Sequence, residues 1–211
     1  MKNKILTLII LVIIYFLLKY IIPFWWIITY PINILVTFMH EFGHSFFAII
    51  TGWEVKSIQI NGDWSWYATT AWWIRDFVIS GGYLGSAIFW NLLLYIWFKK
   101  EKLSENILYF ISALIIFVAV FWFNSILSSW ILFILAGWLF ALAKYTKYDS
   151  LVLQFLWISS IIFIIEDFNV WPSSDLEKFS SFLPSSVWMV VWLILVIAIT
   201  WYNLKLIFKK K

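Results

Sequence analysis

Apolar residues are grouped in long runs that recur from one end of the chain to the other, separated by short polar or charged stretches. Most runs approach about 20 residues, the length at which a helix crosses the hydrocarbon core of a bilayer. The pattern predicts seven helices, at about Ile5–Ile22, Ile32–Thr51, Phe77–Phe98, Ile107–Phe123, Ile126–Ala143, Leu151–Phe168 and Val187–Phe208. Pro23 and Pro31 are expected to bound the first connection. The break at Asn124-Ser125 is short, so the fourth and fifth helices are the least separated pair.

One segment has a different pattern. In Glu54–Ala71, the pair Asn61-Gly62 is a strong turn signal, and Trp64, Trp66 and Ala68 alternate with other residues after it. The segment therefore predicts a β-hairpin after the second helix. Two roles remain open for it: an edge that pairs with an extended substrate, or a surface hairpin that rests on lipid headgroups by its tryptophans.

The composition places the helices in a membrane. The chain is 64% hydrophobic and 12% charged, with a mean hydropathy of +0.93, values that no soluble globular domain shows. We therefore expect an all-α polytopic membrane protein, with one domain over residues 1–211. Its fold should be a bundle of about six to seven transmembrane helices with one short β-hairpin after the second helix.

The net charge of +4 comes from lysines that gather at residues 99–102, 144–147 and 205–211. Such clusters anchor the cytoplasmic ends of membrane helices, which predicts a multi-pass protein of the cell membrane, in contact with the lipid bilayer, and argues against nucleic-acid binding. The three clusters are expected on one side of the membrane. Seven spans would place the two termini on opposite sides.

The candidate chemistry lies in the second predicted helix. The chain has two histidines, His40 and His44, and they bracket Glu41 in the sequence HEFGH. Residues four apart share a helix face, so the two imidazoles can hold one zinc ion while the glutamate acts as a general base on the attacking water. The alternative is a polar contact between helices, but histidine occurs nowhere else in the chain. Ionisable groups in the middle of an apolar run indicate function.

Zinc needs at least one more protein ligand. The chain has no cysteine and no third histidine, so the ligand must be a carboxylate. Glu166 and Asp167 follow the sixth apolar run, where the helix dipole opposes a negative charge and a cation would compensate. We therefore predict Asp167 as the third ligand. Asp175 is the alternative, although Ser174 and Glu177 have capping-box spacing and place it in the first turn of a short helix.

The third predicted helix opens with small residues in the sequence SGGYLGSA, from residue 80 to residue 87. Glycines four apart allow two helices to approach closely. Gly82, Gly85 and Asn91 are therefore candidates for helix packing or for substrate binding, with packing the favoured role of the glycines.

These segments resemble the site-2 protease class of intramembrane zinc metalloproteases, most closely its small bacterial members. The resemblance runs through HEFGHSFFAIITGWEV, the hairpin, SGGYLGSAIFWNLLL, the aspartate after the sixth helix, and the segment from Leu183-Pro184 to Trp192. It implies that Zn²⁺ is bound by His40, His44 and Asp167. It also implies that Glu41 is the base and that the substrates are membrane-anchored proteins cut in or near the bilayer. Residues 165–168 differ from the L-D-G or N-P-D-G sequence of better-known members.

The sequence thus favours an intramembrane zinc endopeptidase, whose partner is a membrane protein with a transmembrane segment. The alternative is a catalytically silent membrane scaffold or regulator that retains the protease fold. The presence of Glu41 favours the enzyme, because a silent protein does not need the base.

Overall fold

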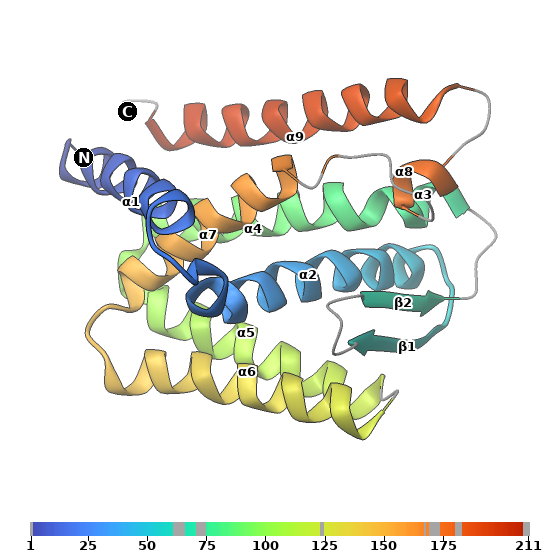
Figure 1. Cartoon of the computed structure of the whole chain (residues 1–211), viewed down its shortest axis with the longest axis horizontal. Coiled ribbons are helices and arrows are strands. Elements are labelled where there is room, and N and C mark those ends of the chain that lie inside the picture. The colour runs from blue at the N-terminus through green and yellow to red at the C-terminus, as the bar shows by residue number, and fades with distance from the viewer. Residues whose placement is uncertain are drawn as a thin grey trace.

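The computed structural model describes residues 2–60, 66–70, 75–122, 125–166, 168, 174–179 and 183–208. Its elements, in chain order, are α1 (Lys2–Tyr20), α2 (Trp25–Ile50), β1 (Val55–Ile60), β2 (Trp66–Thr70), α3 (Arg75–Ser80), the π-helical turn η1 (Gly81–Gly85), α4 (Ser86–Lys99), the 3-10 turn η2 (Glu101–Leu103), α5 (Ser104–Phe121), α6 (Ile126–Tyr145), α7 (Asp149–Glu166), α8 (Asp175–Lys178) and α9 (Ser185–Phe208). Figure 1 shows how these elements are arranged.

Long apolar helices dominate the described part of the chain, as the sequence predicts. Because α3, η1 and α4 follow one another directly, they form one helical stretch that corresponds to the third predicted helix. Among the described residues, five stretches are long and apolar enough to cross a membrane: Arg75–Lys99, Glu101–Phe121, Ile126–Tyr145, Asp149–Glu166 and Ser185–Phe208. Helix α1 contributes a shorter apolar stretch, Ile5–Tyr20, and α2 carries the histidine motif. The all-α polytopic membrane fold with a small hairpin is confirmed.

Helix α2 begins earlier than expected, at Trp25, and Pro31 lies inside it. Proline removes one backbone hydrogen bond, but here it does so near the start of a long helix, where tertiary packing outweighs the loss. The prediction that Pro31 ends the first connection was therefore wrong. The longer helix still places His40 and His44 on one continuous helix.

The helices lie side by side in a bundle (Figure 1). Helix α9 covers one side and packs on α4, while α5 and α6 pair on the opposite side. Helices α2, α4 and α7 lie between them and contact one another. The buried core therefore runs through the middle of the bundle, where Trp90, Trp97 and Phe38 are almost completely buried.

Both ends of the described chain lie at the same end of the bundle, together with the lysine-bearing segments after α4 and after α6 (Figure 1). The expectation that the termini lie on opposite sides was wrong. Helix α1 is tilted, and the chain does not reach the opposite end of the bundle before α2 begins (Figure 1). The lysine-rich segments were expected on the same side as the C-terminal end of the last helix, and this arrangement agrees with that expectation.

The hairpin lies at the other end of the bundle, beside α2 (Figure 1). Strands β1 and β2 are antiparallel, and Ile58 is opposite Ala68. The Ile58 N–H donates a hydrogen bond to the carbonyl oxygen of Trp122, at the end of α5, over 3.2 Å. The outer edge of β1 is therefore attached to α5, and the outer edge of β2 faces α2.

Candidate metal centre

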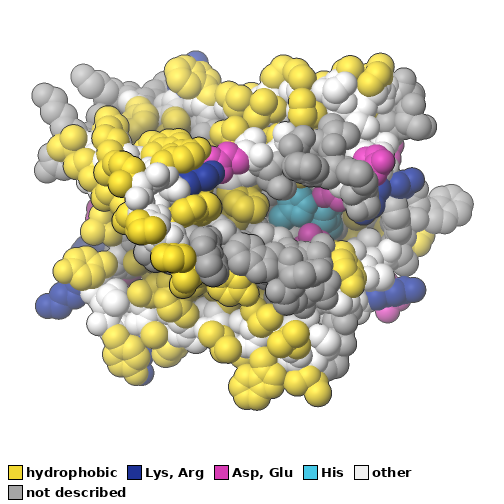
Figure 2. Space-filling view, in the orientation of Figure 1, with side chains coloured by type: hydrophobic (Ala, Val, Ile, Leu, Met, Phe, Trp, Pro, Cys, Tyr) yellow, Lys and Arg dark blue, Asp and Glu magenta, His cyan; other side chains and the backbone are white. Residues whose placement is uncertain are grey.

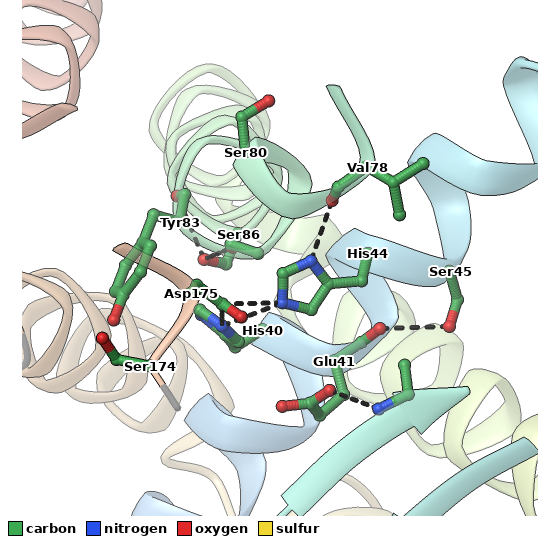
Figure 3. Close-up of polar contacts among 12 residues, drawn as sticks. His40, Glu41, His44, Ser45, Val78, Ser80, Tyr83, Ser86, Ser174 and Asp175 are labelled. Carbon is green, nitrogen blue, oxygen red and sulfur yellow. Dashed lines mark hydrogen bonds and ion pairs between the residues drawn. The ribbon is translucent and has the colours of Figure 1, made fainter. Parts of the chain in front are cut away.

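The side chains of His40, His44 and Asp175 converge on one point (Figure 3). Asp175 Oδ2 lies 2.8 Å from His40 Nε2 and 2.9 Å from His44 Nε2, and the two imidazole nitrogens are 3.1 Å apart. The histidines share a face of α2 because they are four residues apart. Asp175 comes from α8, which follows α7 in the chain, so elements distant in sequence assemble the cluster.

A backbone carbonyl fixes the tautomer of neutral His44. Its Nδ1 lies 2.9 Å from the carbonyl oxygen of Val78. Because a carbonyl oxygen only accepts, Nδ1 must carry the hydrogen, and neutral His44 then presents the lone pair of Nε2. Metal-bound histidines are commonly oriented by such a bond from the second ring nitrogen.

The three converging atoms suit a metal ion. His44 Nε2 and the carboxylate oxygen of Asp175 point at the same position, 2.9 Å apart, so a cation there can be bound by both. Tetrahedral ligands with bonds of about 2.0 Å lie about 3.3 Å from one another. The observed separations of 2.8–3.1 Å are slightly shorter, so a small expansion would admit an ion. Two imidazoles and one carboxylate form a three-ligand set that leaves a position open.

Asp175 is the carboxylate that the sequence analysis kept as the alternative ligand. The predicted ligand Asp167 lies outside the described residues. Ser174 caps α8 as its spacing predicts, because its hydroxyl accepts the hydrogen bond from the Glu177 N–H. Asp175 lies in the first turn of α8, also as predicted, and its side chain nevertheless faces the histidines. Burial disfavours its charged form, but His44 and His40 outweigh that effect and hold the pKa of Asp175 well below its usual range.

Glu166 has a different cation. At the C-terminal end of α7 it forms an ion pair with Lys19 of α1, and the Lys19 ammonium also lies over the ring of Trp25. A carboxylate at this helix end was expected to need a positive partner. For Glu166 that partner is a lysine and not a metal ion.

Glu41 is buried beside the cluster. Its Oε2 accepts a hydrogen bond from the backbone N–H of Ala68, in β2, over 2.7 Å. In Figure 3 this oxygen points at the strand and the second oxygen points away from it. The carboxylate is thus tied to the hairpin through one of its two oxygens.

The small residues of the third helix pack closely on α2. A Cβ atom on Gly43 would stand 2.3 Å from the carbonyl oxygen of Gly81, and one on Gly85 would stand 3.3 Å from the Cα of Gly43. The backbones of α2 and η1 can approach this closely because these positions lack side chains. Gly82 differs, because its missing Cβ points at the side chains of His40 and His44.

Asn91 connects two helices. Its Nδ2 donates to the carbonyl oxygen of Ala87 and to the hydroxyl of Thr200, and its side chain and backbone oxygens accept from Asn203. Asn91 is buried, and these contacts tie α4 to α9. The geometry favours a structural role for this residue over direct substrate contact.

Two contributors to the site have no side-chain signature in the sequence. They are the carbonyl of Val78, which orients His44, and the N–H of Ala68, which holds Glu41. A hint of the first was the run of glycines after Ser80, since a π-helical turn often marks a functional site and changes the hydrogen-bond register of the helix. The second could not be anticipated without knowing which edge of the hairpin faces α2.

The centre is partly accessible. The side chains of His40, His44 and Asp175 retain 14%, 10% and 21% of their exposure. Figure 2 shows the histidines between other side chains on one face of the molecule, with acidic groups beside them. The cluster is therefore partly exposed on this face.

One comparison with known proteins gave a match: the model of the family described as Peptidase M50B-like matches residues 6–203. No curated protein and no solved structure matches the chain.

Proposed function

The chain belongs to the Peptidase M50B-like family, and from this premise we propose that it is an intramembrane zinc endopeptidase that hydrolyses peptide bonds of membrane-anchored proteins. The observation that carries the proposal is the convergence of His40, His44 and Asp175, with Glu41 beside them, inside a bundle of apolar helices. Membership of the family supports a metal-dependent protease in a multi-pass membrane protein. Zinc, the residue roles and the substrate class are the finer parts of the proposal.

We assign the zinc ligands as His40 Nε2, His44 Nε2 and Asp175 Oδ2. The donor set is nitrogen and oxygen, which suits a catalytic zinc site with an open position. When bound, the ion supplies Lewis acidity that makes water a nucleophile near neutral pH and polarises the scissile carbonyl. The Val78 carbonyl fixes the tautomer of His44 and so keeps its Nε2 available.

Glu41 is the proposed general base. Its free oxygen would take a proton from the attacking water and later deliver it to the amine of the leaving product. The hydrogen bond from Ala68 fixes the other oxygen, so the carboxylate rotates little and keeps its free oxygen in place. A catalytically silent scaffold with the same fold would not need a carboxylate held in this way.

The hairpin is proposed to present the substrate. A peptide bond inside a helix is hidden from attack, so a transmembrane substrate must be extended at the cleavage point. The outer edge of β1 is attached to Trp122, whereas the outer edge of β2 lies next to the catalytic glutamate. The place of β2 beside Glu41 supports a role of the hairpin in substrate presentation over the interpretation of the hairpin as a headgroup contact.

The test uses the full chain reconstituted in lipid vesicles together with single-span membrane proteins as candidate substrates. The purified wild-type protein should contain about one zinc ion and cleave in or near the transmembrane segment. Glu41→Gln should keep zinc and lose cleavage, and His44→Ala should lose both. Glu105→Gln, at an exposed carboxylate on α5, is the control and should behave as the wild type. Cleavage by Glu41→Gln at the wild-type rate would contradict the proposed mechanism.

A further inference from the structure

The position of Gly82 against the two histidines has a consequence for metal binding. We propose that Gly82 is a positioning residue of the metal centre: its missing side chain is the space that allows His40 and His44 to bring their Nε2 atoms to one ion. The inference rests on the proposed function, because it assigns the histidines to a metal. Beyond that assignment, Gly82 lies on another helical element, and its lack of a side chain determines whether the ligands can converge.

The clearance is small. A Cβ atom built on Gly82 would stand 2.5 Å from His40 Nε2 and 2.6 Å from His44 Cε1, well inside the roughly 3.5–4.0 Å at which nonbonded carbon atoms are in contact. The atoms it would meet belong to the two imidazoles themselves. An alanine at this position must therefore displace the metal ligands or move the backbone of η1.

The backbone is held where it is. The buried Ser86 hydroxyl donates to the Gly82 carbonyl oxygen over 2.6 Å, and the adjacent glycines pack directly on α2. His44 is also held, by its bond to Val78. His40 stands edge-to-face against the Tyr83 ring, with the ring centroids 4.6 Å apart. The expected response to a methyl group is thus a displacement of the His40 ring, which takes its Nε2 away from the shared point.

The other glycines allow the effect to be separated from helix packing and from helix propensity. Gly85 faces Gly43 and Phe47 on α2, at 3.3 Å, so its substitution tests packing between the same two elements. Gly137 lies in α6 with nothing within 4 Å of its Cβ position, so its substitution tests the intrinsic preference for alanine in a helix. Among the described glycines, Gly82 alone has its Cβ position directed at the two imidazoles.

The first experiment measures metal affinity in the full chain purified in detergent. Gly82→Ala should bind zinc at least about tenfold more weakly, the lower end of the effect seen when groups that orient metal ligands are altered. It should also change the visible absorption bands of the Co²⁺ form, which report the ligand geometry. Gly137→Ala should match the wild type in both measurements, and Gly85→Ala should affect thermal stability more than metal affinity. Wild-type zinc affinity and Co²⁺ bands in Gly82→Ala would overturn the inference.

A second experiment covers the case in which Gly82→Ala folds poorly. In a His40→Ala/His44→Ala background the three nearest atoms in the way are gone. In this background, adding Gly82→Ala should change the melting temperature of the metal-free protein no more than Gly137→Ala does. When both histidines are present, Gly82→Ala should lower the melting temperature. An equal decrease in both backgrounds would show that Gly82 serves packing alone and would overturn the inference.

The same series separates this inference from the proposed function. If His40→Ala/His44→Ala retains full zinc, the metal site is assigned wrongly and the role of Gly82 fails with it. If that double variant loses zinc while Gly82→Ala binds normally, the metal site stands and only the positioning role is rejected.

Discussion

Replacing Ala68 by proline would remove the hydrogen bond from its N–H that ties Glu41 to the hairpin. Proline has no N–H, so the 2.7 Å bond to Glu41 Oε2 cannot form. The hairpin itself keeps its ladder. Ala68 is opposite Ile58, and the N–H groups of both residues point outward, to Glu41 and to Trp122, so neither is used between the strands.

The magnitude follows from the type of bond. A hydrogen bond to a charged acceptor contributes about 1.5–3 kcal/mol. If that energy keeps the carboxylate in its working orientation, its loss lowers kcat by roughly 10- to 150-fold, since 1.4 kcal/mol is a factor of ten. KM and zinc content should change little, because neither the metal ligands nor the rest of the β2 edge is altered.

The assay is the cleavage rate of a single-span substrate in vesicles, measured beside zinc content and thermal stability. Tyr67→Pro is the control, because Tyr67 is opposite Gln59 in the register and its N–H points into the ladder. It should weaken the hairpin and raise KM with a smaller loss of kcat than Ala68→Pro causes. Wild-type kcat in Ala68→Pro would refute the reasoning. An equal loss of kcat in both variants would show that hairpin integrity, and not the bond to Glu41, is what matters.

Three further predictions concern the ligand and the helix contacts. Asp175→Asn should weaken zinc binding by more than about 100-fold, since the loss of groups that only support the ligands already weakens metal affinity by about 10–100-fold. Asp167→Asn should keep the metal, and competition with a chelator measures both variants. Asn203→Leu removes the donor that joins α9 to α4 and should lower the free energy of unfolding by about 0.6–1.7 kcal/mol, measured in bicelles. Lys19→Met should destabilise the protein by up to about 1 kcal/mol with zinc retained, and adding Glu166→Gln should recover part of that loss in a double-mutant cycle.

The helices and the histidine pair were predictable because their signals are local. Run length and hydropathy indicate helices, and the spacing of His40 and His44 places them on one face. The start of α2 was not predictable in this way, because Pro31 normally suggests a boundary and the packing that retains it in the helix comes from distant segments.

The choice of a metal ligand among the carboxylates also depends on contacts between distant segments, which local sequence does not reveal. The helix dipole correctly indicated that Glu166 needs a cation, but the partner is Lys19, 147 residues away, which no local pattern reveals. Ser174 caps α8 and Asp175 lies in its first turn, as the spacing predicts. That position counted against Asp175 as a ligand, yet a residue in a first turn can also lie beside two histidines.

The backbone groups at the site lie beyond such reasoning altogether. The carbonyl of Val78 could come from any residue type and the N–H of Ala68 from any residue type except proline. Their roles follow from how α3 faces His44 and from the hairpin edge that faces α2. Both depend on how the elements pack against one another and not on the local sequence.

The most direct test of the metal centre is an anomalous difference map at the zinc absorption edge from crystals of the full chain. We expect one strong peak, about 2 Å from His40 Nε2, His44 Nε2 and Asp175 Oδ2, with Glu41 near it but not bound to it. A zinc ion elsewhere in the bundle would show that the metal centre is assigned wrongly. So would an ion held by the two histidines and Asp167, with Asp175 turned away.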